Sequence, residues 1–188
     1  MTGFDRVKNI VLTPNFMTIS RIAAVPLIVI LLIYETKITT FSAAILFSAA
    51  SITDYLDGYL ARTRGLVTKL GKILDPMADK LLVSSTLVML VSLGFIQAWI
   101  VCVIIGRELA VTSLRCVLIE NSQDVAASWL GKYKTGFQIA AIIPLTIHYN
   151  YIGINFNAIG LFFLYGALIF TVWSGLDYFI KSRKFLSL

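Results

Sequence analysis

Six long, mostly apolar segments constrain this chain more than any other feature of its sequence. A membrane-spanning helix needs about 20 predominantly apolar residues. Segments of roughly this kind lie at residues 18–34, 39–61, 73–95, 98–119, 136–149 and 156–180. Charged residues make up 14% of the 188 residues, against roughly 25% in soluble domains. The sequence therefore predicts an all-α integral membrane protein, with six transmembrane helices in one membrane-embedded domain over residues 1–188.

The segment 1–15, which precedes the first apolar stretch, has a different character. Phe4, Val7 and Val11 recur at helical spacing, with charged and polar residues between them. This pattern predicts a short amphipathic helix lying on the membrane surface. A disordered tail is the alternative.

Basic residues are concentrated at both ends of the chain and in every second connection between the apolar segments. Such residues favour the cytoplasmic side of a membrane. They are Arg6, Lys8, Arg21, Arg62, Arg64, Lys69, Lys72, Lys132, Lys134, Lys181, Arg183 and Lys184. The other three connections carry only Lys37. We therefore expect a multi-pass protein with both termini in the cytoplasm.

Four aspartates lie where the second and third apolar segments meet. Asp54 and Asp57 end the second segment, and Asp75 and Asp79 begin the third. Residues three or four apart share one face of a helix. A short connection would make the two helices antiparallel neighbours, so all four carboxylates can converge just below the cytoplasmic surface.

Such a cluster needs a compensating positive charge. Each carboxylate within a membrane costs about 3 kcal/mol, so four would cost roughly 10 kcal/mol. Pairing with arginine is one option. Carboxylate oxygens on two facing helices also suit Mg²⁺ or Mn²⁺ better than zinc, and two such ions could share the cage.

Small residues share the acid-bearing faces. Gly58 and Ala61 follow the first two aspartates, and Gly71 precedes the last two. Helix packing is the ordinary explanation for any single small residue. Three of them beside the acids favour a ligand that lies flat against the helices. A metal together with Arg62 suggests that this ligand is phosphorylated.

The complete spacing is Asp54-x2-Asp57-Gly58-x2-Ala61-Arg62-x8-Gly71-x3-Asp75-x3-Asp79. It resembles the signature of the CDP-alcohol phosphatidyltransferases at every position. The resemblance implies that CDP-diacylglycerol donates its phosphatidyl group to an alcohol and that CMP leaves. It also implies a homodimer. By the same resemblance, the metal ligands are Asp54, Asp57 and Asp75. Asp79 is the base that acts on the acceptor hydroxyl and a further metal contact. The CDP-diacylglycerol site is lined by Gly58, Ala61, Arg62 and Gly71.

A second group of charges lies further along the chain. Arg107, Glu108 and Arg115 fall inside an apolar segment, and Lys132 and Lys134 stand at the next cytoplasmic edge. Arginine within a span is rarely without a function. A phosphate on the acceptor would explain the cluster. The alternative is a structural pair between Glu108 and a neighbouring base, with lysines that only anchor the loop.

Three looser motifs narrow the resemblance. "PNFMTISRI", "GREL" and "KYKTGFQ" resemble the bacterial phosphatidylglycerophosphate synthases, in which the acceptor is glycerol 3-phosphate. This resemblance implies a location in the bacterial cytoplasmic membrane. Asn15, Thr18 and Arg21 could help to close the nucleotide site, or they could form an entry turn and an interfacial anchor. Inositol phosphate, inositol, serine and phosphatidylglycerol remain alternative acceptors.

Two other classes of protein compete with an enzyme. Buried acids also mark the ion pathways of divalent-cation transporters. A pathway places polar groups at several depths or near the midplane, whereas these acids cluster on one side. A structural scaffold would not need four costly acids. The sequence therefore favours the enzyme over both.

Overall fold

The computed structural model describes residues 14–64, 69–120, 129–151 and 153–183. Within these ranges it does not describe the side chains of residues 14–17, 54–64, 69–73, 75, 119–120, 130 and 151. The predicted interfacial segment 1–15 therefore lies outside the described residues, apart from the last two, which begin the first described helix.

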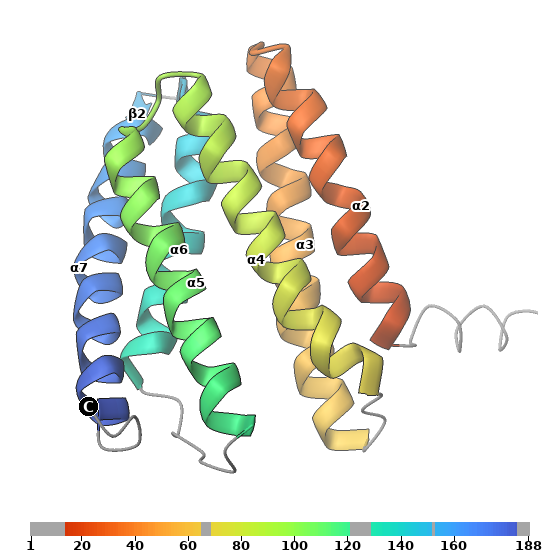
Figure 1. Ribbon diagram of the computed structural model, residues 1–188. Helices are drawn as coiled ribbons and strands as arrows, with labels where there is room; N and C mark the ends of the chain where they lie inside the picture. The colour runs from red at the N-terminus through yellow and green to blue at the C-terminus, as the bar shows by residue number, and fades with distance from the viewer. Residues whose placement is uncertain (1–13, 65–68, 121–128, 152, 184–188) are drawn as a thin grey trace, which may run out of the picture. The chain divides into compact units, whose positions relative to one another are not determined.

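Six helices account for most of the described residues (Figure 1). They are α2 (Pro14–Ile33), α3 (Lys37–Arg64), α4 (Lys69–Ser92), α5 (Ala98–Glu120), α6 (Trp129–Ile147) and α7 (Phe156–Ser182). Two short antiparallel strands, β1 (Asn150–Tyr151) and β2 (Ile154–Asn155), join α6 to α7. The all-α prediction is confirmed, and each predicted segment corresponds to one helix.

One described helix, α7, is both long and apolar enough to cross a membrane by itself. Shorter apolar stretches occur at Thr18–Ile33 in α2 and at Lys37–Thr53 in α3. Charged residues interrupt the apolar sequence of α4, α5 and α6, among them Asp79, Arg107 and Lys134. The prediction of six spans is thus not confirmed on this criterion and stays a prediction.

The chain packs as two compact units, Met1–Met89 and Leu90–Leu188, and each is described by itself. In the first unit, α2 packs along α3. Its buried residues include Ala24, Ile28 and Leu32 of α2, and Ala43 and Phe47 of α3. Small and large apolar side chains on one face of each helix account for this packing.

In the second unit, α7 packs along α6 and also contacts α5. Glycines let α7 come close to α6. A Cβ on Gly160 would lie 2.5 Å from Cγ of Leu145, and one on Gly166 would lie 2.7 Å from the ring of Phe137. The side chain of Asn155 accepts a hydrogen bond from the backbone N–H of Ala158 at 3.0 Å and so caps α7.

Candidate active site

The helices that carry the aspartates are continuous through the whole signature. Because α3 runs to Arg64, Asp54 and Asp57 share one helical face, and α4 places Asp75 and Asp79 on another. Both halves of the signature therefore lie on helices, as predicted, and the arrangement of their side chains stays a prediction. The signature side chains outside the described residues are those of Asp54, Asp57, Gly58, Ala61, Arg62, Gly71 and Asp75.

Asp79 is the one aspartate of the four whose side chain is described, and it is half-buried. Among the described side chains, no three His, Cys, Asp or Glu residues gather to hold a metal. Convergence of the four carboxylates, and the metal ions that they would hold, therefore stay predictions.

A hollow of about 190 Å³ lies between α2 and α3, beside the acidic end of α3. Its lining is Ser20, Arg21, Ala24, Leu46, Ala49, Ala50 and Thr53. Thr53 directly precedes Asp54, and Arg21 is only 3% exposed. Thr18, one turn before Arg21, is fully buried. The structure thus brings Arg21 close to the start of the aspartate signature. The side chain of Asn15 lies outside the described residues.

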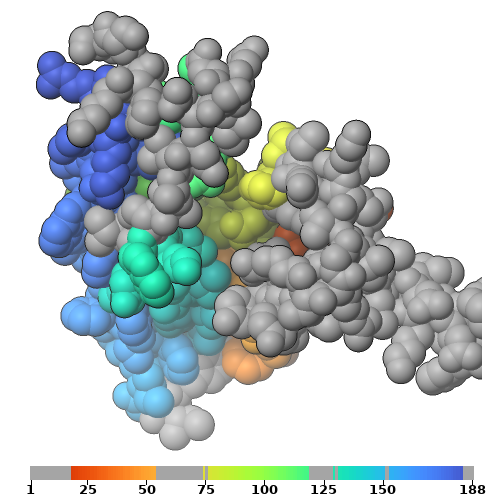
Figure 2. All heavy atoms as spheres, turned by 90° about the horizontal axis from the view of Figure 1, so that it is seen from below, coloured from red at the N-terminus to blue at the C-terminus, as the bar shows by residue number. Residues whose placement is uncertain are grey.

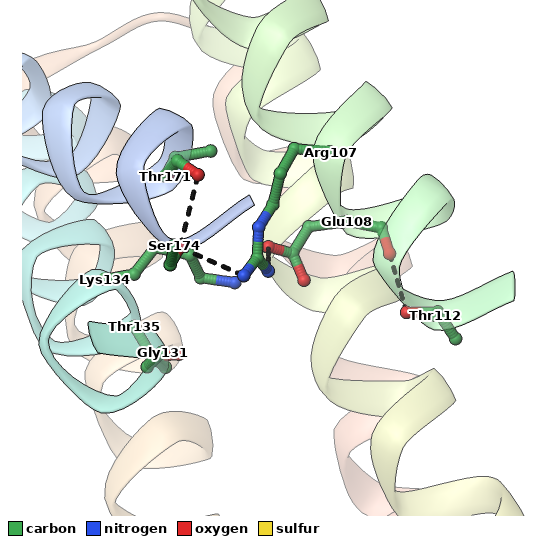
Figure 3. A network of polar contacts seen from close by, with 8 residues as sticks. All are labelled: Arg107, Glu108, Thr112, Gly131, Lys134, Thr135, Thr171 and Ser174. Atoms are coloured by element: carbon green, nitrogen blue, oxygen red, sulfur yellow. Dashed lines mark hydrogen bonds and ion pairs between the residues drawn. The ribbon is translucent and has the colours of Figure 1, made fainter. Parts of the chain in front are cut away.

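The second unit contains a polar cluster formed by Arg107 and Glu108 of α5, Lys134 of α6 and Ser174 of α7 (Figure 3). One oxygen of Glu108, Oε1, contacts both the ammonium of Lys134 and Nη1 of Arg107, the latter at 3.3 Å. The side chain of Lys134 is 6% exposed, and those of Arg107 and Glu108 are 15% and 16% exposed. One carboxylate therefore serves two cations in a cluster that is mostly buried.

Arg107 reaches beyond this carboxylate to α7. Its Nη2 donates a hydrogen bond to Oγ of Ser174 at 3.0 Å. Its Nε is buried and has no hydrogen-bond partner among the described residues. A buried donor without a partner costs about 1–3 kcal/mol, so this group has an unmet capacity to donate a hydrogen bond.

The other two predicted bases of this group lie apart from the cluster. The guanidinium carbon of Arg115 lies 6.0 Å from the ring centre of Tyr178, and the ammonium of Lys132 lies 4.4 Å from the ring of Trp129. Both bases are exposed. Figure 2 shows the start of α6, in teal, on the surface of its unit. The structure thus joins Lys134 to Arg107 and separates Lys132 from them.

The structural alternative, in which Glu108 pairs with a neighbouring base, is present. Glu108 contacts two bases rather than one, Arg107 and Lys134. Sequence reasoning missed the contribution of α7. Residues Thr171, Ser174, Gly175, Tyr178 and Ser182 are all buried and recur at helical spacing in an otherwise apolar helix. That stripe of polar and small residues was the available signal.

Comparison with known proteins identifies the family of the whole chain. The family model of the CDP-alcohol phosphatidyltransferases matches residues 11–173. A Bacillus subtilis protein named CDP-diacylglycerol–glycerol-3-phosphate 3-phosphatidyltransferase is 42% identical, with 92% of this chain and 96% of that protein covered. Proteins of the same name from Rickettsia bellii and Escherichia coli K12 are 37% and 35% identical. The match to the Rickettsia protein covers 92% of this chain and 96% of that protein. The match to the Escherichia protein covers 90% of this chain and 94% of that protein.

Proposed function

Because this chain belongs to the CDP-alcohol phosphatidyltransferase family, we propose that it transfers the phosphatidyl group of CDP-diacylglycerol to glycerol 3-phosphate and releases CMP. The names of relatives that cover nearly the whole chain support both the reaction and the acceptor. Within the structure, the cluster of Arg107, Glu108 and Lys134 is the observation that carries the proposal.

This cluster suits an acceptor that bears its own phosphate. Arginine and lysine bind phosphate through charge-assisted hydrogen bonds, which are stronger than those between neutral groups. Arg107 and Lys134 place two cations beside the single carboxylate of Glu108. Nε of Arg107 is a further buried donor. Inositol and serine carry no phosphate for these two cations to bind, so the cluster favours glycerol 3-phosphate over uncharged or zwitterionic acceptors. Arg115 lies two turns further along α5, next to Tyr178 of α7, and stays a separate proposed contact to the acceptor's phosphate.

The aspartate signature fits a hard divalent cation, since it offers carboxylate oxygens from one face of α3 and one face of α4. The residues that would hold it are Asp54, Asp57, Asp75 and Asp79. When bound, one or two Mg²⁺ or Mn²⁺ ions would neutralise the diphosphate and stabilise the departing CMP. Gly58, Ala61, Arg62 and Gly71, together with Asn15, Thr18 and Arg21, would hold the CDP-diacylglycerol.

In the proposed reaction, the hydroxyl oxygen of the acceptor attacks the phosphorus that carries the diacylglycerol. A new P–O bond forms, the P–O bond to CMP breaks, and CMP leaves with that electron pair. The carboxylate of Asp79 takes the proton of the acceptor hydroxyl. One substrate is a lipid and the other dissolves in water, so the site belongs at the cytoplasmic interface of a multi-pass protein. A homodimer is part of the same proposal.

The direct test gives the purified protein labelled CDP-diacylglycerol, Mg²⁺ and a panel of acceptors. We expect CMP release and a phosphatidylglycerophosphate product with glycerol 3-phosphate. Inositol, serine, inositol phosphate and phosphatidylglycerol should give little product. Turnover with inositol phosphate alone would support the phosphatidyl transfer but contradict glycerol 3-phosphate as the acceptor. If none of the five acceptors gave CMP release, the proposed enzymatic activity would be contradicted.

Two neighbouring lysines supply a matched pair for the acceptor site. Lys134→Gln removes a buried charge, and we expect it to raise the KM for glycerol 3-phosphate roughly tenfold to a hundredfold. Lys132→Gln removes an exposed charge and should have a much smaller effect. Equal effects of both variants would contradict a phosphate site centred on Arg107 and Lys134.

A further inference from the structure

Helix α7 contacts Arg107 through two adjacent residues, Ser174 and Gly175. Ser174 is 1% exposed, and its hydroxyl accepts a hydrogen bond from Nη2 of Arg107 at 3.0 Å. The same hydroxyl donates its proton to the backbone carbonyl of Thr171 at 3.2 Å. Figure 3 shows both contacts of Ser174. Because the proton is donated to the backbone, the oxygen accepts from Arg107 through a lone pair.

Gly175 makes room for the stem of the same arginine. A Cβ built on Gly175 would lie 3.1 Å from Cγ and 3.7 Å from Nε of Arg107. The backbone at Gly175 is helical, so a positive φ does not require glycine here. Glycine inside a helix costs up to about 1 kcal/mol relative to alanine, which leaves the close approach of Arg107 as its reason. Gly136 of α6 provides the contrast, because a Cβ there would have none of the described atoms within 4 Å.

These contacts hold the guanidinium at a defined distance from Glu108. Nη1 lies 3.3 Å from the Glu108 carboxylate, and Lys134 contacts the same oxygen. Without the contact from α7, the Nη2 group of Arg107 would lose its acceptor on Ser174, and the guanidinium could rotate about its contact with Glu108. The direction of Nε would then no longer be fixed.

We infer that Ser174 and Gly175 are positioning residues that set the affinity for the acceptor's phosphate by fixing the guanidinium of Arg107. This inference deepens the proposed function and rests on it. Helix α7, which carries no part of the aspartate signature, thereby becomes an element that determines acceptor specificity.

The test measures CMP release while glycerol 3-phosphate and CDP-diacylglycerol are varied separately. We expect Ser174→Ala and Gly175→Ala each to raise the KM for glycerol 3-phosphate roughly threefold to tenfold. This is less than the loss of a whole hydrogen bond to a charged group, because Arg107 itself remains. The KM for CDP-diacylglycerol should change less than about twofold on the same reasoning. Ser174→Thr keeps the hydroxyl and should restore affinity, and Gly136→Ala should leave both constants unchanged.

A double-mutant cycle separates positioning from a general structural role. If Ser174 acts through Arg107, then Ser174→Ala should have no further effect on the KM for glycerol 3-phosphate in an Arg107→Ala background. A full effect in that background would overturn the inference. So would an equal rise in both KM values, or unchanged constants in Ser174→Ala and Gly175→Ala. If the wild-type protein releases no CMP with glycerol 3-phosphate, the proposed function itself fails, and the inference fails with it.

Discussion

Asp79 differs from the other aspartates of the signature in its place along α4. It lies one turn beyond Asp75, about 6 Å further along the helix axis. That position suits a group that faces the acceptor hydroxyl rather than the diphosphate. If Asp79 is the base, Asp79→Asn should keep nucleotide binding but lower kcat by roughly 10²–10⁴-fold.

The comparison variants for Asp79 are Asp54→Asn and Asp57→Asn, which should weaken metal and nucleotide binding together because a charged ligand is lost. Asp177→Asn is a control, since Asp177 pairs with Lys181 one turn away on α7 at 2.8 Å. Nucleotide affinity, metal dependence and turnover are measured for all four variants. Near-normal turnover of Asp79→Asn would require another base, and loss of its nucleotide binding would make Asp79 chiefly a ligand.

At the residue scale, sequence reasoning predicted the shared helical faces that local spacing encodes and missed the contacts that depend on packing. The aspartates repeat at helical intervals, so their shared faces were predictable before any fold was known. Lys132 and Lys134 are two residues apart in sequence and looked equivalent. Only the approach of α5 to this part of the chain, where Glu108 contacts Lys134, distinguishes the buried lysine from the exposed one.

At the scale of elements, the helix boundaries were predicted well where composition changes sharply and poorly where it does not. Helix α5 begins at Ala98, as predicted, and α7 begins at Phe156. Helix α6 begins at Trp129, seven residues before the predicted start at residue 136. Its first turns contain two lysines and two glycines, which resemble a loop in sequence. Tertiary pairing of Lys134 explains why a charge is tolerated there.

The α6–α7 contact supports a prediction about stability. A Cβ on Gly160 would lie 2.5 Å from Cγ of Leu145 and 2.9 Å from its backbone nitrogen. The backbone of α6 cannot yield as a flexible side chain would, so Gly160→Ala should destabilise the protein by about 1–3 kcal/mol. Its apparent Tm in detergent should fall by several degrees, at roughly 2–4 °C per kcal/mol.

The matched control for this substitution is Gly131→Ala in α6, where none of the described atoms lies within 4 Å of the new Cβ. Alanine is the better helix former, so Gly131→Ala should leave the Tm unchanged or raise it slightly. An unchanged Tm for Gly160→Ala would mean that α6 and α7 are further apart in the membrane than the structure has them.

At the scale of the whole molecule, the distribution of charge and the length of α6 together predict a topology. Helix α6 has 19 residues, which gives about 28 Å at 1.5 Å per residue, close to the roughly 30 Å of a bilayer core. Its first residue, Trp129, is 72% exposed next to the basic edge, and Ile154, 48% exposed, lies beyond its other end in the hairpin. Basic residues favour the cytoplasmic side, so Trp129 should lie inside the cell and Ile154 outside.

This topology is tested by placing single cysteines at these two positions. Cys102 and Cys116 are exposed and are first replaced by alanine, so that the native thiols do not react. In intact cells, an impermeant thiol reagent should label Ile154→Cys and spare Trp129→Cys, and permeabilised cells should show labelling of both. The reverse labelling pattern would mean that the protein has the opposite orientation in the membrane. Labelling of both positions in intact cells would mean that α6 does not span the bilayer, and the active site could not then be assigned to the cytoplasmic face from the charges alone.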